Sequence, residues 1–363
     1  MPCLVSGSGR RRVASATGRS GVILQGASTT TTSVDSRTAH GSPLTTPPRD
    51  AAATRPGRWW FWLRLAIVCG LVATLIGGAV HLIVRAAGTA IDEPALNESS
   101  GLVASHLNPG VFWSHNDSGR VAELFAFTAD GQAVATLTMP GVRVRDWEDL
   151  AIGQDADGRA FGALYIGDIG DNGGGRDNVS VFRLPEPDLS TVVPGEPVAL
   201  TVMDAERYEL VYDDGPGDAE TLMVDPRDGA ILVVKKTMDE TAPLYRADLP
   251  RDGTVTTLVR QSDVAIPGLL GLTRLATGGA ISPSADRVVV RTYVAAWWWP
   301  VAPGQSIADA MTAIPSRLSL PAMRQGEAIA FSADGQTLYV TSEGSPALLG
   351  SIPAPAAPGS PDL

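Results

Sequence analysis

The unit GEAIAFSADGQTLYVTSEG, at residues 326–344, decides the fold because variants of it recur along the chain. Each copy begins with a polar residue, and continues as a short apolar strand, a turn and a second apolar strand that ends in polar residues. The other copies are ESSGLVASHLNPGVFWSHND (98–117), WEDLAIGQDADGRAFGALYIGD (147–168), DAETLMVDPRDGAILVVKKT (218–237) and a degenerate TGGAISPSADRVVVRTY (277–293). Asp-Gly and Pro-Gly turns predict a β-hairpin in most of these units.

Apolar runs after each hairpin predict further strands. Third strands are expected at Glu123–Phe127, Val179–Leu184, Pro243–Ala247, Ala295–Trp299 and Ala347–Ile352, and fourth strands at Ala133–Thr138, Pro197–Met203 and Thr254–Arg260. Four-stranded sheets at intervals of about 40–60 residues are typical of a β-propeller. Five repeats are visible, and Tyr208–Tyr212 leaves room for one more. We therefore expect an all-β propeller of five or six blades over 95–353. A β-sandwich, the alternative, would not repeat one unit five times.

The residues before the repeats have a different character. Residues 1–58 are rich in Ser, Thr, Gly and Arg, which predicts a disordered cytoplasmic tail. Within 59–85, the run Leu65–Val84 holds 20 residues without Asp, Glu, Lys or Arg, enough for one transmembrane helix. The Arg-rich flank predicts a single-pass type II protein of the plasma membrane with the propeller outside. Residues 86–94 are expected to be a linker and 354–363 a flexible tail.

Two other interpretations of the apolar run, a signal peptide and a lipoprotein anchor, fit its residues less well. A signal peptide could be cleaved near Gly88–Ala90, but the run is longer than a usual signal-peptide core. A lipoprotein cysteine at Cys69 would follow the bulky Val68, where a small residue is expected. An uncleaved anchor fits the run better.

Charge and cysteine content exclude some classes of protein. The net charge is −11, and residues 86–363 hold 18 Lys and Arg against 37 Asp and Glu. Such a domain repels phosphates, so nucleic acid is not an expected partner. Both cysteines, Cys3 and Cys69, precede the repeats. The propeller therefore has no disulfide and depends on its hydrophobic core.

Polar residues occur at matching places in successive repeats, so they should form rings at one mouth of the propeller. The starts of the first strands supply Glu148, Glu220 and Glu327, with Gly279 interrupting the series. The ends of the second strands supply His115, Asn116, Asp117, Asp168, Lys235, Lys236, Arg291 and Glu343. Residues at such a mouth are the expected ligand site. The alternative is that these charges pair with one another and stabilise the packing of the blades.

Acidic and amide residues gather in HNDSG (115–119), DWED (146–149) and GDIGDN (167–172). Hard cations such as Ca²⁺ prefer six to eight oxygen ligands of this kind. The expected ligands are Asp117, Glu148, Asp168, Asp171 and Asn172. The spacing is not that of an EF-hand, and Asp and Asn beside Gly also form turns without any metal.

No nucleophile elbow, zinc-binding helix or phosphate loop occurs in the repeats. The candidates for acid–base chemistry are His115 and Glu148, because both belong to the expected mouth. A histidine beside Asn and Asp can equally be a hydrogen-bonded structural group.

The patterns WSHNDSG, DWEDLA, YIGDIGDN, DAETLMVDPRDG and GEAIAFSADGQTLYVTSEG resemble those of bacterial secreted or membrane-anchored β-propellers of the esterase-like phytase and gluconolactonase type. The resemblance implies a fold and leaves the reaction open. The expected function is a module that binds a cell-envelope protein or a small ligand. The alternative is a metal-assisted hydrolase of the phytase-esterase or lactonase kind.

Overall fold

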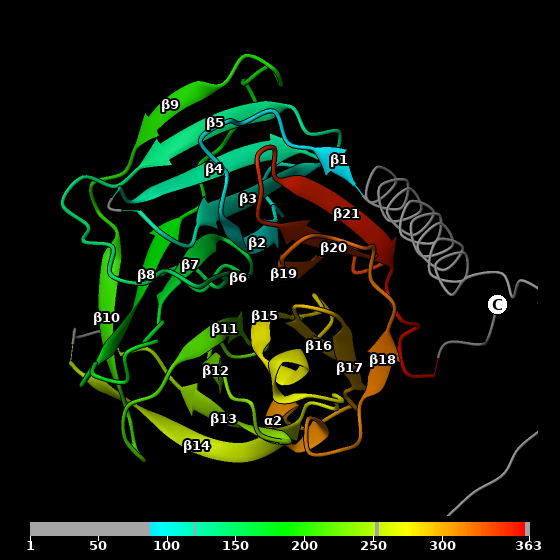
Figure 1. Cartoon of the computed structure of the whole chain (residues 1–363). Helices are drawn as coiled ribbons and strands as arrows, with labels where there is room; N and C mark the ends of the chain where they lie inside the picture. Colours follow the sequence, from blue (N-terminus) through cyan, green and yellow to red (C-terminus); the bar gives the residue numbers. More distant parts are fainter. Residues whose placement is uncertain (1–87, 120, 251–253, 360–363) are drawn as a thin grey trace, which may run out of the picture. The chain divides into compact units, whose positions relative to one another are not determined.

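The computed structural model describes residues 88–119, 121–250 and 254–359. In these residues, sheets of antiparallel strands surround a common centre (Figure 1), as in a β-propeller. The expected tail at 1–58 and the expected transmembrane segment at 59–85 lie outside the described residues. No helix within the described ranges has the length and apolar character needed to cross a membrane.

Each blade is a sheet whose strands follow one another from the centre outward. The first contains β2 (Ser99–Ala104), β3 (Val111–Asn116), β4 (Glu123–Thr128), β5 (Ala133–Thr138) and the added β9 (Val198–Thr201). The second contains β6 (Asp149–Gly153), β7 (Ala163–Asp168), β8 (Val179–Pro185) and β10 (Glu206–Tyr212). The third contains β11 (Ala219–Val224), β12 (Ile231–Lys235), β13 (Thr241–Ala247) and β14 (Thr256–Ala265).

The last two blades follow the same plan. The fourth contains β15 (Ala276–Ile281), β16 (Arg287–Thr292), β17 (Ala296–Pro300) and β18 (Ser316–Leu318). The fifth contains β19 (Gly326–Phe331), β20 (Thr337–Ser342), β21 (Leu348–Pro353) and β1 (Thr89–Ala90). The described residues thus form five blades, and their inner strands contact one another in the order β2, β6, β11, β15, β19 and back to β2.

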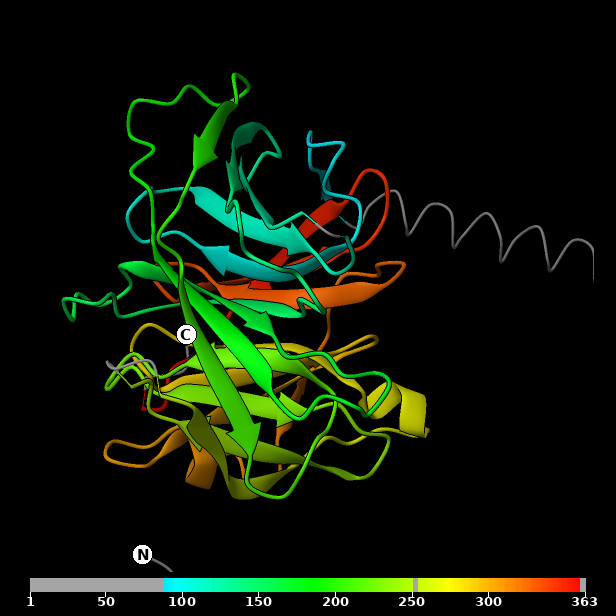
Figure 2. The ribbon, with the colours of Figure 1, turned by 90° about the vertical axis from the view of Figure 1, so that its left-hand side faces the viewer.

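The segment Tyr208–Tyr212, which left room for a sixth blade, lies within β10, the outer strand of the second blade. β10 also pairs in parallel with β14 and so joins the second and third blades at the periphery (Figure 2). The expected strand at 197–203 forms β9, which pairs in parallel with β5 of the first blade.

The ring is closed by the N-terminal strand. β1 pairs with β21, and the following Ile91 and Leu96 are buried. Part of the segment expected to be a linker therefore belongs to the last blade. The reason is geometric: a closed ring leaves β21 without an outer neighbour, and β1 covers that edge.

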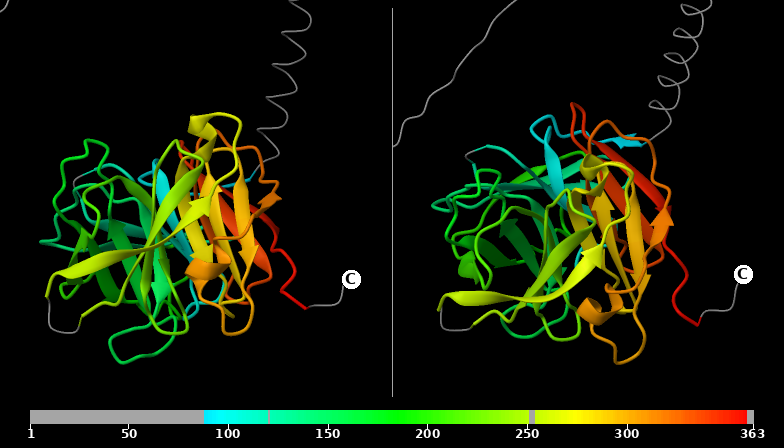
Figure 3. Two further views of the ribbon diagram at one scale, coloured as in Figure 1. Left: turned by 90° about the horizontal axis from the view of Figure 1, so that it is seen from below. Right: turned by 60° about the horizontal axis from the view of Figure 1, so that its bottom comes forward.

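Two short helical segments interrupt the strands. The 3₁₀ turn η1 (Gly271–Arg274) projects from one end of the ring (Figure 3). The helix α2 (Ile307–Ala310) begins after Ser306, whose hydroxyl accepts a hydrogen bond from the Asp309 N–H at 3.0 Å. Serine is a favoured residue at this capping position, and the helix lies in the connection between β17 and β18, where Ile307, Ala310 and Met311 are buried.

The core lies between neighbouring blades. Trp113, Trp147, Leu150 and Phe182 pack between the first and second blades, and equivalent clusters fill the other interfaces. Fully buried aromatic rings remove about 150–250 Å² each from water. The blades are therefore held face to face by apolar packing, which leaves the polar ends of the strands for the two openings of the ring.

Candidate functional site

One end of the ring, here called the mouth, is where the inner strands begin and the second strands end. The antiparallel registers place Ser99 opposite Asn116, Asp149 opposite Gly167, and Ala219 opposite Lys235. The two series of polar residues expected from the repeats therefore arrive at the same end of the ring.

A bulge occurs at the start of four of the five inner strands, β2, β11, β15 and β19, and affects which residues face the mouth. Across the bulge one strand has an extra residue, as between Ser99 and Leu102 or between Ala276 and Gly278. Two residues before the aligned positions Leu102, Leu150, Leu222, Gly279 and Ile329 stand Ser100, Glu148, Glu220, Thr277 and Glu327. Thr277, not Gly279, is thus the fourth member, because the register pairs Gly279 with Val290 as it pairs Leu222 with Val233.

The hydroxyl members of this series tie blades together. Ser100 Oγ donates to the Glu148 carbonyl at 2.5 Å, and Thr277 Oγ1 donates to the Glu327 carbonyl at 2.8 Å. Each bond reaches the next blade. The glutamates of the series do not make this bond between blades.

Three carboxyl groups converge in the mouth: Asp117, Asp146 and Glu148 each offer an oxygen within 4.8 Å of the others. Among the described residues, the recorded hydrogen bonds and ion pairs include none to these three carboxyl groups. Gly170 lies directly against two of them, because a Cβ atom there would overlap Glu148 Oε1 and an Asp146 oxygen. We call these three residues the acidic triad; it could hold a metal ion.

Burial and mutual repulsion raise the pKa of every member of the triad. Burial, together with the nearby charges of Glu220 and Asp117, raises the pKa of Glu148 to about 11. Burial also raises the pKa of Asp117 to about 6, aided by Asp146. A divalent cation would relieve this repulsion, since it supplies the positive charge that the surrounding residues do not.

Lys236 and Glu220 form an ion pair beside the triad, and Lys236 Nζ lies 3.2 Å from Tyr293 Oη. Burial raises the pKa of Glu220 to about 7 despite this pair. Glu220 Oε2 is buried and has no hydrogen-bond partner within the described part of the chain. Lys236 therefore brings a positive charge to the mouth, and its ion pair neutralises one carboxylate there, that of Glu220.

Lys235 does not reach the mouth. Its ammonium group pairs with Asp214 at 3.1 Å and lies over the rings of Tyr212 and Tyr245, 4.2 and 4.7 Å from their centroids. Adjacent residues of a strand point to opposite faces, so Lys235 and Lys236 are separated in space.

The other expected metal ligands serve their own loop. Asp168 pairs with Arg176 at 2.8 Å and accepts the Asp146 N–H at 3.1 Å. Asp171 accepts the backbone N–H groups of Gly175 and Arg176, and Asn172 is exposed. The acidic triad thus takes only Asp117 and Glu148 from the expected set. It adds Asp146, which the DWED segment contains but which was not among the expected ligands.

His115 is fully buried beside Trp147, with the ring centroids 5.6 Å apart. Its Nδ1 lies 2.9 Å from the Asn116 carbonyl, and burial lowers its pKa to about 4. The neighbouring Asn116 side chain binds the N–H groups of Asn97 and Glu98. The His115 ring is enclosed by the protein and cannot reach the surface of the mouth, and the half-buried Asn116 amide is held by the backbone of residues 95–98.

Arg291 is also buried, and it donates to the carbonyls of Ala328 at 2.8 Å and Thr341 at 3.2 Å. Burial lowers its pKa to about 10, and burial raises the pKa of the adjacent Glu327 to about 8. Glu343 is half-buried near Glu327, and burial raises its pKa. Arg291 therefore braces two blades, whereas Glu327 and Glu343 extend the acidic surface of the mouth.

Asp149 was not among the expected site residues, yet it links three blades. Its Oδ2 accepts the N–H groups of Leu222 at 2.9 Å and Gly279 at 3.3 Å, and its Oδ1 accepts the Leu150 N–H at 2.8 Å. Burial raises its pKa well above the ordinary value. The sequence held one signal, an acidic residue where the other repeats carry Gly, Thr or Ala, but only the closed ring shows what it binds.

Comparisons with known proteins return structures and no family. No family model and no curated protein matches the chain. A PQQ-bound aldose sugar dehydrogenase from Streptomyces coelicolor is similar over 72% of this chain and 96% of its own, with 12% identity and a TM-score of 0.42. A gluconolactonase from Xanthomonas campestris is similar over 71% of this chain and 72% of its own, with 16% identity and a TM-score of 0.37.

Proposed function

We propose that the protein is a membrane-anchored, extracytoplasmic β-propeller whose mouth binds a divalent cation, with Ca²⁺ as the preferred ion. Through this cation the mouth binds a ligand or a protein of the cell envelope. The observation that carries the proposal is the acidic triad, in which three carboxyl groups lie within 4.8 Å of one another without a recorded donor. Oxygen ligands of this kind suit Ca²⁺ and Mg²⁺ better than softer metals.

Three protein ligands leave coordination positions open, since Ca²⁺ takes six to eight oxygens. Those positions would accept water or an oxygen of a bound partner. The apolar run Leu65–Val84 and its Arg-rich flank support the anchor and the orientation in this proposal. The acidic surface of the propeller also favours a cationic occupant over a nucleic acid.

Calcium titration of the full chain in detergent, followed by calorimetry, tests the proposal. Glu148→Gln should abolish saturable binding, whereas Glu196→Gln should leave it unchanged, because Glu196 is an exposed loop residue. Glu148→Gln should still fold, since burial already favours the neutral acid. Absence of Ca²⁺ and Mg²⁺ binding in the parent protein would refute the cation site.

A metal-assisted hydrolase is the second candidate, and the pKa of Glu220 favours it. Raised to about 7, this carboxyl group borders the triad and could exchange a proton near neutral pH. A bound cation would supply polarisation of a water or an ester oxygen. His115 is not a candidate base, because it is buried away from the mouth.

A screen of esters, lactones and phosphate esters with Ca²⁺ separates the two candidates. Turnover that is lost in Glu220→Gln while Ca²⁺ binding persists would favour the hydrolase. Calcium binding with no turnover of any ester, lactone or phosphate ester would favour the binding module.

A further inference from the structure

A second cleft lies between the first and second blades, and no member of the acidic triad lines it, although Asp168, which accepts the Asp146 N–H, does. It has a volume of about 590 Å³. Arg143 and Arg145 line it from the connection between β5 and β6, and Arg207 lines it from β10. Pro140 and Met203 are exposed and supply apolar surface on the same cleft. Three guanidinium groups thus gather beside an apolar wall.

Two of the three arginines of this cleft, Arg143 and Arg145, form no ion pair with the described residues. Arg143 and Arg145 are exposed, and the ion pairs recorded among the described residues include neither. The lining carboxylate, Asp168, is already held by Arg176 at 2.8 Å. Residues 86–363 hold about two acidic residues for each basic one, so carboxylates that could pair with Arg143 and Arg145 are abundant. That these two arginines stay unpaired therefore suits a role in binding a ligand.

Arg207 is the member held in place. Its Nη2 donates to Ser180 Oγ at 2.9 Å, and its Nη1 lies 3.4 Å from Glu209 Oε2. Its position on a strand gives it a fixed base, whereas Arg143 and Arg145 sit on a loop and can adjust to a ligand. A guanidinium group binds carboxylate and phosphate oxygens through two parallel hydrogen bonds.

We propose that this cleft binds a small organic oxyanion, a phosphate ester or a carboxylate, whose apolar body packs on Pro140 and Met203. Arg143 and Arg145 bind the anionic group, and Arg207, which Ser180 and Glu209 hold in place, fixes the orientation of that group. The site shares the connection that carries Asp146 but none of the acidic triad, so it does not require the cation. Its failure and the failure of the cation site are therefore separable.

Phenyl phosphate, benzoate and the neutral benzamide are suitable probes, titrated into the full chain in detergent with a chelator present. Phenyl phosphate and benzoate should bind saturably, and benzamide should not. The double variant Arg143→Ala, Arg145→Ala should weaken binding about tenfold or more, as loss of charge-assisted hydrogen bonds does. Arg317→Ala is the control: it also removes an exposed arginine, from strand β18 outside the cleft, and should leave binding unchanged.

Several outcomes would overturn the proposal. These are no saturable binding of either anion at millimolar concentration, equal binding of benzamide, or the same loss in Arg317→Ala as in the double variant. A thermal melt checks that the double variant folds. If it does not, Arg143→Lys, Arg145→Lys is used, which keeps the charge and removes the paired guanidinium contacts; full affinity in that variant contradicts the proposal.

Discussion

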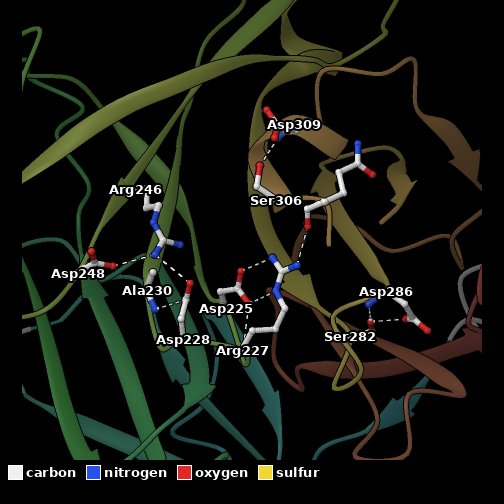
Figure 4. A network of polar contacts seen from close by, with 11 residues as sticks. Asp225, Arg227, Asp228, Ala230, Arg246, Asp248, Ser282, Asp286, Ser306 and Asp309 are labelled. Atoms are coloured by element: carbon white, nitrogen blue, oxygen red, sulfur yellow. Dashed lines mark hydrogen bonds and ion pairs between the residues drawn. The ribbon is translucent and has the colours of Figure 1, made fainter. Parts of the chain in front are cut away.

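The two ends of the propeller differ in whether their acidic side chains have hydrogen-bond donors. At the end opposite the mouth, side chains close the turns that follow the inner strands (Figure 4). Asp225 pairs with Arg227 at 2.6 Å, and Ser282 Oγ donates to Asp286 at 2.7 Å. At the mouth, the triad has no recorded donor among the described residues.

The pKa values separate the two ends. Burial acts to raise the pKa of Asp225, but the hydrogen bonds from Arg227 outweigh this effect and hold that pKa below its ordinary value. The Ser332 hydroxyl does the same for Asp334. Burial raises the pKa of Glu148 and Glu327 instead. The far end is thus built for stability, and the mouth keeps charge that only a ligand or a proton can satisfy.

The largest effect is expected from Asp149→Ala, just inside the mouth. The change leaves the N–H groups of Leu222 and Gly279 without their acceptor. We expect the free energy of unfolding to fall by about 3–5 kcal/mol, because several buried donors lose their partner together. Denaturant titration measures the loss. A decrease below about 1 kcal/mol, as for an ordinary surface change, would contradict the role of Asp149 in joining blades.

Calcium should stabilise the protein through the mouth alone. At a hundredfold excess over Kd, the gain in unfolding free energy is about 2.7 kcal/mol. Thermal melts with Ca²⁺ and with chelator should differ in the parent and in Asp225→Asn, and should coincide in Glu148→Gln. If Asp225→Asn also lost the calcium effect, the contrast between the ends would be wrong.

The pH dependence of stability should show one limb for each end. In chelator, Glu327 keeps its proton to about pH 8 when folded but loses it near its ordinary pKa of 4.5 when unfolded. Stability therefore falls as the pH rises from about 5 to 8, by about 1–2 kcal/mol after solvent relaxation.

The far-end acids have lowered pKa values, so their contribution is lost as the pH falls below about 4. Glu327→Gln should make the limb above pH 5 shallower, the rest coming from the raised pKa values of Asp117, Glu148 and Glu220, and should leave the acid limb unchanged. A stability curve that is flat from pH 5 to 8 in chelator would count against the buried state of Glu327.

The smallest effect is expected at the far end. Asp225→Ala removes the Arg227 ion pair and the turn hydrogen bond to the Arg227 N–H at 3.0 Å. We expect a loss of about 1 kcal/mol, since each such bond contributes little on balance. Chemical denaturation measures it, and calcium affinity should be unchanged. A loss as large as that of Asp149→Ala would erase the distinction between the ends.

The sequence by itself determined the repeat, the strands and the end of the ring where polar residues gather. The reason is that an apolar strand, a turn and a second strand are local patterns, which Asp-Gly turns and alternating burial specify within about twenty residues. It also identified Asp117, Glu148, Glu220 and Glu327 as residues of that end, because their place in the unit repeats.

Only the tertiary structure decided which of those residues meet. The bulge at the start of β15 moved Thr277 into the ring and Gly279 out of it, and a bulge leaves no clear mark in the pattern of polar and apolar residues. Asp146 joined the triad while Asp168 turned to Arg176, because loops that are distant in sequence meet only when neighbouring blades pack. Closure by β1 and the three-blade contact of Asp149 depend in the same way on the completed ring.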